Sequence, residues 1–171
     1  MNDTWGYNKY DNNWKKPDDI IRFLLKINSR GGNYLLNVGP DSNGRIPEGS
    51  TQVLDQVGKY IRENSEAIFD TKRVDIYAYE LEWAQFTRKD YKLYIHMLQP
   101  KIRIELLNVG NHVKRAYLVK DKTELPYKIM KACEGNSIIE VQLPEYLYDQ
   151  KNYCVCLEME EKEPIFEPIE G

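Results

Sequence analysis

The chain has 171 residues, of which 42% are hydrophobic and 30% charged, and its formal net charge is -3. This length suffices for one domain, or for one domain and part of another, but a β/α barrel of the eightfold type needs about 250 residues and does not fit. The small negative charge argues against a nucleic-acid surface, and no apolar run reaches the roughly 18 residues that a membrane span needs.

Residues 1–16 are rich in Asn, Asp, Lys and aromatic residues without a sustained period, which predicts a loop. A helix is expected to begin at Pro17, because proline suits a first helical turn and the two aspartates that follow complement the positive end of the helix dipole. Its apolar face is formed by residues at helical spacing, namely Ile20, Ile21, Leu24, Leu25 and Ile27. Gly31 and Gly32 should end this helix, since glycine readily takes the left-handed conformation found after a last turn.

A short apolar run from Tyr34 to Val38 predicts a strand buried on both faces, of the kind found in parallel sheets. Residues 39–44 (GPDSNG) form a dense turn signal. A second helix is expected after Pro47, with an apolar stripe made by Val53, Leu54, Val57 and Ile61. Gly49 and Gly58 should each weaken this helix by about 1 kcal/mol relative to alanine.

The pattern changes near residue 70 from helices to short strands. Residues 83–88 and 92–98 flank Lys89-Asp90-Tyr91 and predict a hairpin. Further strands are expected at 102–107, 114–119, 127–131, 138–143 and 153–159. Short strands at roughly ten-residue spacing are typical of a β-sandwich or a barrel-like pair of sheets. The predicted fold is therefore an α/β fragment over residues 1–70, followed by an all-β sandwich domain over residues 71–171.

Cysteine and histidine are too scarce for a disulfide scaffold or a metal centre. The cysteines are Cys133, Cys154 and Cys156, and the last two should point to one face of a strand. Only His96 and His112 could add imidazole ligands, and we expect both to be surface or hydrogen-bonded residues of the sandwich. The predictions are packing roles for the cysteines and no metal or other cofactor.

Four segments in this order resemble the C-terminal part of the retaining α-L-fucosidases, glycoside hydrolase family 29. They are residues 1–7 (MNDTWGY), 31–40 (GGNYLLNVGP), 44–48 (GRIPE) and 64–69 (NSEAIF). The resemblance is strong over residues 1–71, and beyond them it rests on position and strand pattern. It implies that residues 1–70 are the end of a TIM-type β/α barrel and that a sandwich domain follows.

The resemblance also implies hydrolysis of terminal α-L-fucose with retention, which requires two carboxyl groups about 5–5.5 Å apart. In the family the aspartate nucleophile and the acid/base, usually a glutamate, lie in barrel segments before the motif at residues 1–7. We therefore expect no catalytic residue in this chain and no fucosidase activity from the chain alone. The aspartates near loops and helix starts have structural explanations and are not expected to replace the missing pair; they are Asp3, Asp11, Asp18, Asp19 and Asp41.

Two residues are candidates for substrate binding in the complete enzyme. The ring of Trp5 could pack against the apolar side of a fucose, or it could plug the barrel rim. Asn37 would lie at the C-terminal end of the barrel strand, where such enzymes place their sites, but the favoured interpretation is a buried amide that bonds the next loop.

The expected partners are a fucosylated glycan, the missing N-terminal barrel segment and a second copy of the chain; nucleic acid and membrane are not expected. An alternative function is a non-catalytic module in which the sandwich binds carbohydrate, mediates oligomerisation or only braces the barrel. Its candidate stacking surface would use clustered aromatics, namely Tyr77, Tyr79, Trp83, Tyr91 and Tyr94. The first residues carry no signal-peptide pattern, so a periplasmic, secreted or lysosomal-type location stays open for the parent enzyme.

Overall fold

The computed structural model describes residues 1–76, 81–109, 113–131 and 137–162. Within these residues three α-helices precede a set of antiparallel strands. The helices are α1 (Pro17–Asn28), α2 (Glu48–Glu63) and α3 (Ser65–Ile68). The strands are β1 (Lys72–Arg73), β2 (Ala84–Lys89), β3 (Lys92–Met97), β4 (Arg103–Leu107), β5 (Val113–Leu118), β6 (Tyr127–Lys131), β7 (Ser137–Gln142) and β8 (Tyr153–Met159).

Both long helices begin where the sequence predicts, and the first also ends there. Pro17 occupies the first turn of α1, and the helix ends before Gly31, whose φ of +79° is the left-handed conformation that suits glycine. The turn before α2 is closed by Asp41, whose Oδ1 accepts hydrogen bonds from the backbone N–H groups of Asn43 and Arg45 at 2.8 and 2.9 Å. Each of these start, stop and turn residues acts on its near neighbours in the chain. They can therefore be recognised from a short stretch of sequence.

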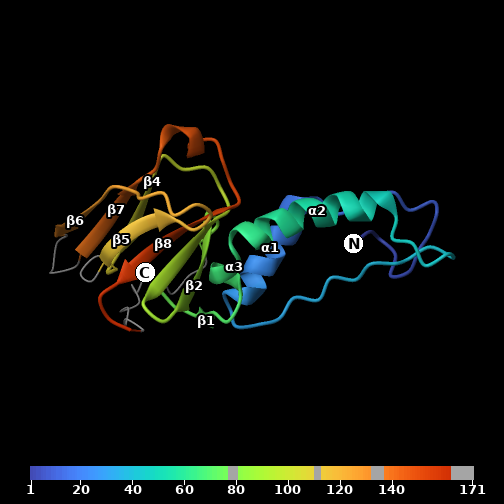
Figure 1. The fold of residues 1–171 in the computed structure, drawn as a ribbon, viewed down its shortest axis with the longest axis horizontal. Helices are drawn as coiled ribbons and strands as arrows, with labels where there is room; N and C mark the ends of the chain where they lie inside the picture. The colour runs from blue at the N-terminus through green and yellow to red at the C-terminus, as the bar shows by residue number, and fades with distance from the viewer. Residues whose placement is uncertain (77–80, 110–112, 132–136, 163–171) are drawn as a thin grey trace.

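The predicted strand over Tyr34–Val38 is wrong for this chain. Residues 32–40 are extended but belong to no sheet, and the side chain of Leu35 is 82% exposed. A strand is held by hydrogen bonds to a neighbouring strand, and in the described structure none lies beside this segment. Figure 1 shows it as an isolated extended connection running below α1 and α2.

Two antiparallel sheets form the second half of the molecule. The larger has the order β1-β2-β3-β8-β5, and the smaller has the order β4-β7-β6. The predicted hairpin is present, with Phe86 opposite Ile95 and with Asp90 in the left-handed region of its turn. The other predicted strands are found within a residue of their expected ends, whereas β1 and the short helix α3 were not predicted.

The molecule has three layers, because the helices cover one face of the five-stranded sheet and the three-stranded sheet covers the other (Figure 1). A large apolar core lies between the sheets and includes Leu93, Ile95, Val155 and Leu157. The opposite faces of β3 and β8 pack toward the helices, which buries these central strands on both sides. The helices therefore dock on the outer face of the five-stranded sheet.

Candidate functional site

The two candidate substrate-binding residues lie next to each other at the end of the molecule far from the sheets. The side-chain amide of Asn37 donates a hydrogen bond to the backbone carbonyl of Trp5 at 2.5 Å. The terminal amino group of Met1 approaches from the same loop and donates a hydrogen bond to the carbonyl of Asn37 at 2.8 Å. A side chain at Gly39 would collide with the backbone of Gly6 and Tyr7. The backbones of residues 1–7 and 37–39 are therefore packed directly against each other.

In this region Trp5 presents its ring to solvent, since its side chain is 83% exposed. Asn37 is half-buried, and its amide holds the backbone of the Trp5 loop. Of the two interpretations of Asn37, the structural amide is the one its contacts show, and its partner is the loop that precedes it in sequence. A direct contact of either residue with a sugar stays a prediction.

Asp11 organises the same loop. Its Oδ2 accepts hydrogen bonds from the backbone N–H and the hydroxyl of Thr4, both at 2.9 Å, and its Oδ1 accepts one from the backbone of Asn13 at 3.2 Å. Desolvation acts to raise the pKa of Asp11, but the hydrogen bonds from Thr4 outweigh it and the pKa is lowered. A carboxylate held in its charged form in this way suits a structural role and not that of a general acid.

A buried polar cluster joins the helices to the sandwich and was not recognised from the sequence. It centres on His96 of β3, which is fully buried. Nδ1 of His96 lies 3.1 Å from the hydroxyl of Tyr60 in α2, and Nε2 lies 3.0 Å from the hydroxyl of Thr87 in β2 and 3.1 Å from the carbonyl of Ala67 in α3. The cluster therefore ties two helices to two adjacent strands.

The partners of His96 define its protonation. A carbonyl only accepts, so Nε2 carries the proton toward Ala67, and Nδ1 is left to accept from the Tyr60 hydroxyl. Burial lowers the pKa of His96 from 6.5 to about 4, although the hydrogen bond to Ala67 opposes this shift. His96 is thus a neutral, fully bonded structural residue, in agreement with the prediction for it, while His112 lies outside the described residues.

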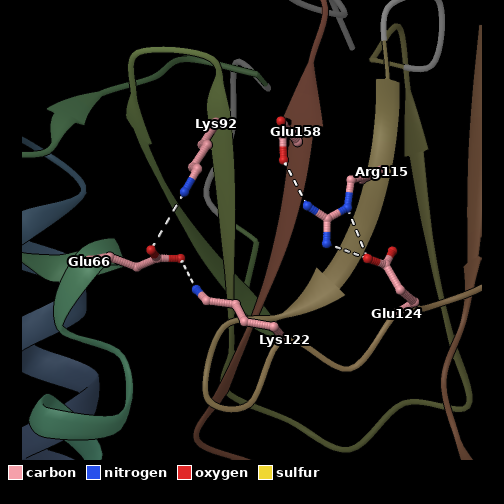
Figure 2. Close-up of polar contacts among 6 residues, drawn as sticks. All are labelled: Glu66, Lys92, Arg115, Lys122, Glu124 and Glu158. Carbon is pink, nitrogen blue, oxygen red and sulfur yellow. Dashed lines mark hydrogen bonds and ion pairs between the residues drawn. The ribbon is translucent and has the colours of Figure 1, made fainter.

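A second, charged cluster lies at the edge of the same junction (Figure 2). Glu66 of α3 lies between two lysines of the sandwich, 3.5 Å from Lys92 and 2.6 Å from Lys122. On the neighbouring strands Arg115 bridges Glu124 and Glu158. These contacts link α3 to β3 and to the turn after β5, so they add to the docking of the helices.

The three described residues of the aromatic set proposed as a stacking surface are not brought together. Tyr94 is 1% exposed and faces the helices, whereas Trp83 packs against the core between the sheets and meets Phe86 edge to face. Tyr91 lies in the hairpin turn and is exposed, and Tyr77 and Tyr79 lie outside the described residues. The alternation of side chains along a strand separates what the sequence places side by side.

Cys154 and Cys156 are buried beneath the helices, and burial raises the pKa of both thiols, to about 12 for Cys156. This agrees with the predicted packing role, since reactive cysteines need a lowered pKa. Cys133 lies outside the described residues. Among the described residues no group of three or more His, Cys, Asp or Glu could hold a metal ion, and no helix is long and apolar enough to cross a membrane.

Residues 1–66 match a protein-family model described as Alpha-L-fucosidase. Tissue alpha-L-fucosidase of Mus musculus is 41% identical over 71 residues, which are 40% of this chain and 16% of the mouse protein. This chain thus corresponds to only a small part of that relative.

Solved structures of similar fold extend the likeness over nearly the whole chain. Alpha-L-fucosidase isoenzyme 1 from Paenibacillus thiaminolyticus has a TM-score of 0.80 at 32% identity, covering 94% of this chain and 38% of that one. The alpha-L-fucosidase from Vibrio sp. strain EJY3 has the same TM-score and identity, covering 96% of this chain and 30% of that one. The homologues of the chain are therefore α-L-fucosidases, and the arrangement of helices and antiparallel sheets is one that occurs in them.

Proposed function

We propose that the chain is the C-terminal part of a retaining α-L-fucosidase. Residues 1–70 would be the end of its β/α-barrel catalytic domain, and residues 71–171 the β-sandwich domain behind it. The observation that carries the proposal is the match of residues 1–66 to the fucosidase family model. The fold similarity to the Paenibacillus enzyme over 94% of the chain supports the extension to the sandwich.

Retaining hydrolysis constrains where the chemistry can lie. One carboxylate attacks the anomeric carbon while a carboxylic acid protonates the leaving oxygen, and the two groups flank the scissile bond about 5–5.5 Å apart. In the loop of residues 1–16, which carries Trp5, the carboxylates are Asp3 and Asp11, and they are engaged by Asn13 and Thr4. We therefore place the nucleophile and the acid/base in barrel segments upstream of these residues.

In the complete enzyme the exposed ring of Trp5 would cover the apolar side of the bound fucose, because the C–H groups of a pyranose are attracted by the negative face of an aromatic ring. Asn37 would act as a positioning residue, since its amide fixes the carbonyl of Trp5. The upstream barrel would also supply neighbours for residues 33–38, whose apolar side chains include the exposed Leu35. The proposed partners are thus a fucosylated glycan and the N-terminal barrel segment.

Hydrolysis of 4-nitrophenyl α-L-fucoside tests this proposal. The purified 171-residue chain is expected to release no 4-nitrophenol above background. When the chain replaces the matching C-terminal part of the Paenibacillus enzyme, activity is expected, because the barrel then brings the carboxylates. Activity of the isolated chain, or a folded but inactive hybrid, would contradict the assignment.

In the hybrid, Trp5→Ala should lower kcat/KM at least tenfold. Tyr10→Ala, which removes another exposed aromatic ring from the same loop, should change it less than twofold. Equal effects of the two substitutions on kcat/KM would show that Trp5 does not contact the substrate.

For the face of the sandwich that packs against the helices we propose a bracing role. The outer face of the five-stranded sheet is covered by α1, α2 and α3 and is bonded to α2 and α3 through His96, which makes it a support for the end of the barrel. Trp83→Ala is expected to leave the hybrid's activity on fucosylated substrates unchanged, since Trp83 packs on the core between the sheets. A loss of glycan affinity in this variant with the fold intact would favour the carbohydrate-binding alternative.

A further inference from the structure

A cavity of about 340 Å³ lies where the sandwich meets the end of α2, away from Trp5 and Asn37. Its walls come from three regions that are distant in sequence: the end of α2, the turn after β5, and the segment between β7 and β8. Polar residues from all three line it, together with Tyr146; they include Glu63, Lys120, Gln150, Lys151 and Asn152. Its volume falls within the range of small-molecule sites.

The walls of this cavity are held by backbone hydrogen bonds. The short 3-10 helix η3 (Glu145–Leu147) closes with a bond from Leu147 to the carbonyl of Pro144, and Gln150 then bonds the carbonyl of Leu147, both at 2.9 Å. Asn152 takes a left-handed φ of 58° and bonds the carbonyl of Met97 at 2.8 Å. A ligand would therefore meet a formed surface and would not have to order these loops.

The charges of the cavity are balanced. Lys120 lies 3.5 Å from Glu63, and Lys151 lies 2.6 Å from Asp18 of α1. The charged residues that line the cavity are two acids and two lysines: Glu63, Asp121, Lys120 and Lys151. The carboxylate of Asp121 accepts a hydrogen bond from the backbone N–H of Thr123 at 3.0 Å. With no net charge among its lining residues, the cavity does not favour an anionic or a cationic ligand.

What the cavity offers instead is an aromatic face beside amide groups. The side chain of Tyr146 is 61% exposed, so its ring can be covered by a ligand. The amides of Gln150 and Asn152 each carry donors and an acceptor, although one amide hydrogen of Asn152 already bonds Asp18 at 2.6 Å. A ring that attracts C–H groups, next to paired donors and acceptors, matches a sugar with its C–H face and its hydroxyl rim.

We propose that this cavity, formed by α2, η3 and the turn after β5, is a binding site for a neutral oligosaccharide. Tyr146 stacks on one sugar ring, and Gln150 and Asn152 bond its hydroxyls. The site would hold a glycan chain on the sandwich while the barrel acts on a terminal residue elsewhere. Binding in the cavity requires none of the fucosidase chemistry, whereas its role beside the barrel rests on the function proposed above.

A titration of the full 171-residue chain followed by ¹H–¹⁵N NMR tests the proposal, with the side-chain amide signals of Gln150 and Asn152 as reporters. The probes are 2′-fucosyllactose, lactose and 3′-sialyllactose. At least one neutral probe is expected to shift both signals at millimolar concentrations, and the anionic 3′-sialyllactose should bind no better than lactose. Absence of any shift at 20 mM neutral sugar, or a preference for the sialylated probe, would overturn the site.

Variants separate this site from other sugar contacts. Tyr146→Ala should weaken binding at least fivefold, whereas Tyr146→Phe keeps the ring and should retain it. Tyr91→Ala is the matched control, because it removes an exposed tyrosine of the sandwich that does not line the cavity. Binding that survives in Tyr146→Ala, or falls equally in Tyr91→Ala, would reject the proposal.

Trp5→Ala distinguishes failure of the proposed sugar site in the cavity from failure of the fucosidase assignment. It should leave the Gln150 and Asn152 shifts unchanged while it lowers turnover of the hybrid enzyme. If the sugar-dependent shifts disappear in Trp5→Ala, the sugar binds at the catalytic face and not in this cavity.

Discussion

Gly49 and Gly58 lie in the same helix, yet a methyl group at each would meet different surroundings. At Gly49 it would come within 2.7 Å of the indole ring of Trp14, whose Nε1 donates a hydrogen bond to the hydroxyl of Ser50 at 3.0 Å. At Gly58 it would approach only the end of the flexible Arg62 side chain, at 3.0 Å. Helix propensity alone predicts the same loss of helix stability at both glycines. It therefore does not capture this difference in surroundings.

Alanine substitutions are therefore expected to have opposite effects. Gly58→Ala should raise the free energy of unfolding by up to about 1 kcal/mol, the gain in helix propensity. Gly49→Ala should lower it by about 1–2 kcal/mol, because overpacking against a rigid, hydrogen-bonded ring outweighs that gain. Urea denaturation measures the free energy of unfolding of both variants. A stabilised Gly49→Ala would show that Trp14 is free to move.

The buried His96 predicts a pH dependence of stability. Its pKa is about 4 in the folded chain and 6.5 without burial, so below about pH 6.5 the unfolded chain binds a proton that the folded chain does not. The stabilisation is complete above pH 6.5 and is lost as the pH falls toward 4. Between pH 7 and pH 5 the loss should be about 2 kcal/mol.

Urea denaturation at pH 7 and pH 5 tests this expectation. His96→Gln cannot titrate, so it should be less stable than the parent at pH 7 but should lose little more between the two pH values. His112→Gln serves as the control and should keep the pH dependence of the parent. An equal loss in His96→Gln would assign the effect to other groups.

At the scale of elements, the short helix α3 connects the helical half of the fold to the sheets. Ala67 gives its carbonyl to both Thr87 and His96, and Glu66 reaches Lys92 and Lys122 (Figure 2). Asn28 of α1 adds a hydrogen bond from its amide to the carbonyl of Ile68 at 3.0 Å. One helical turn thus contacts both the helices and the larger sheet.

Glu66→Gln should lower the free energy of unfolding by about 0.5–1 kcal/mol at low salt, because the contact is a network of partly exposed charges. The difference from the parent should shrink in 1 M NaCl, where such charges are screened. Glu124→Gln is the matched control, since Glu124 pairs with Arg115 within the sandwich and does not link α3 to it. A salt-independent effect of Glu66→Gln would point to packing in place of charge.

At the scale of the whole molecule, exposed apolar side chains gather in the first half of the chain. Trp5, Tyr10 and Leu35 are all at least 80% exposed. In Figure 1 the extended segment after α1 runs below α1 and α2, on the side of the molecule that points away from the sheets. Surfaces of this kind mark interaction sites. The barrel segment proposed above would cover them, and in its absence a second copy of the chain can.

We therefore expect the isolated chain to self-associate as its concentration rises, which sedimentation velocity measures directly. Leu35→Ser should shift the association to higher concentration. Ile102→Ser, at an exposed apolar position of the sandwich, should not. Equal behaviour of the two variants would remove the extended segment from the interface.

The elements of this fold were readable from sequence wherever a few neighbouring residues decide the outcome. The proline and aspartates at the start of α1, the left-handed glycine after it and the alternation of β8 act over one or two turns of chain. The ordered motifs in residues 1–69 likewise indicated relatives that the comparisons then found. The strand expected at Tyr34–Val38 failed because a strand also needs a neighbour, which no local pattern supplies.

The candidate site was predictable only in part, for the same reason. Sequence by itself determined that Trp5 and Asn37 belong to motifs of one family, but only the tertiary structure decided that the Asn37 amide holds the Trp5 loop. Likewise, the sequence determined that His96 lies in a strand, while packing against α2 and α3 made it a buried, neutral junction residue. The cavity beside Tyr146 exists only because three distant segments meet, and contacts between distant segments are set by how the layers pack.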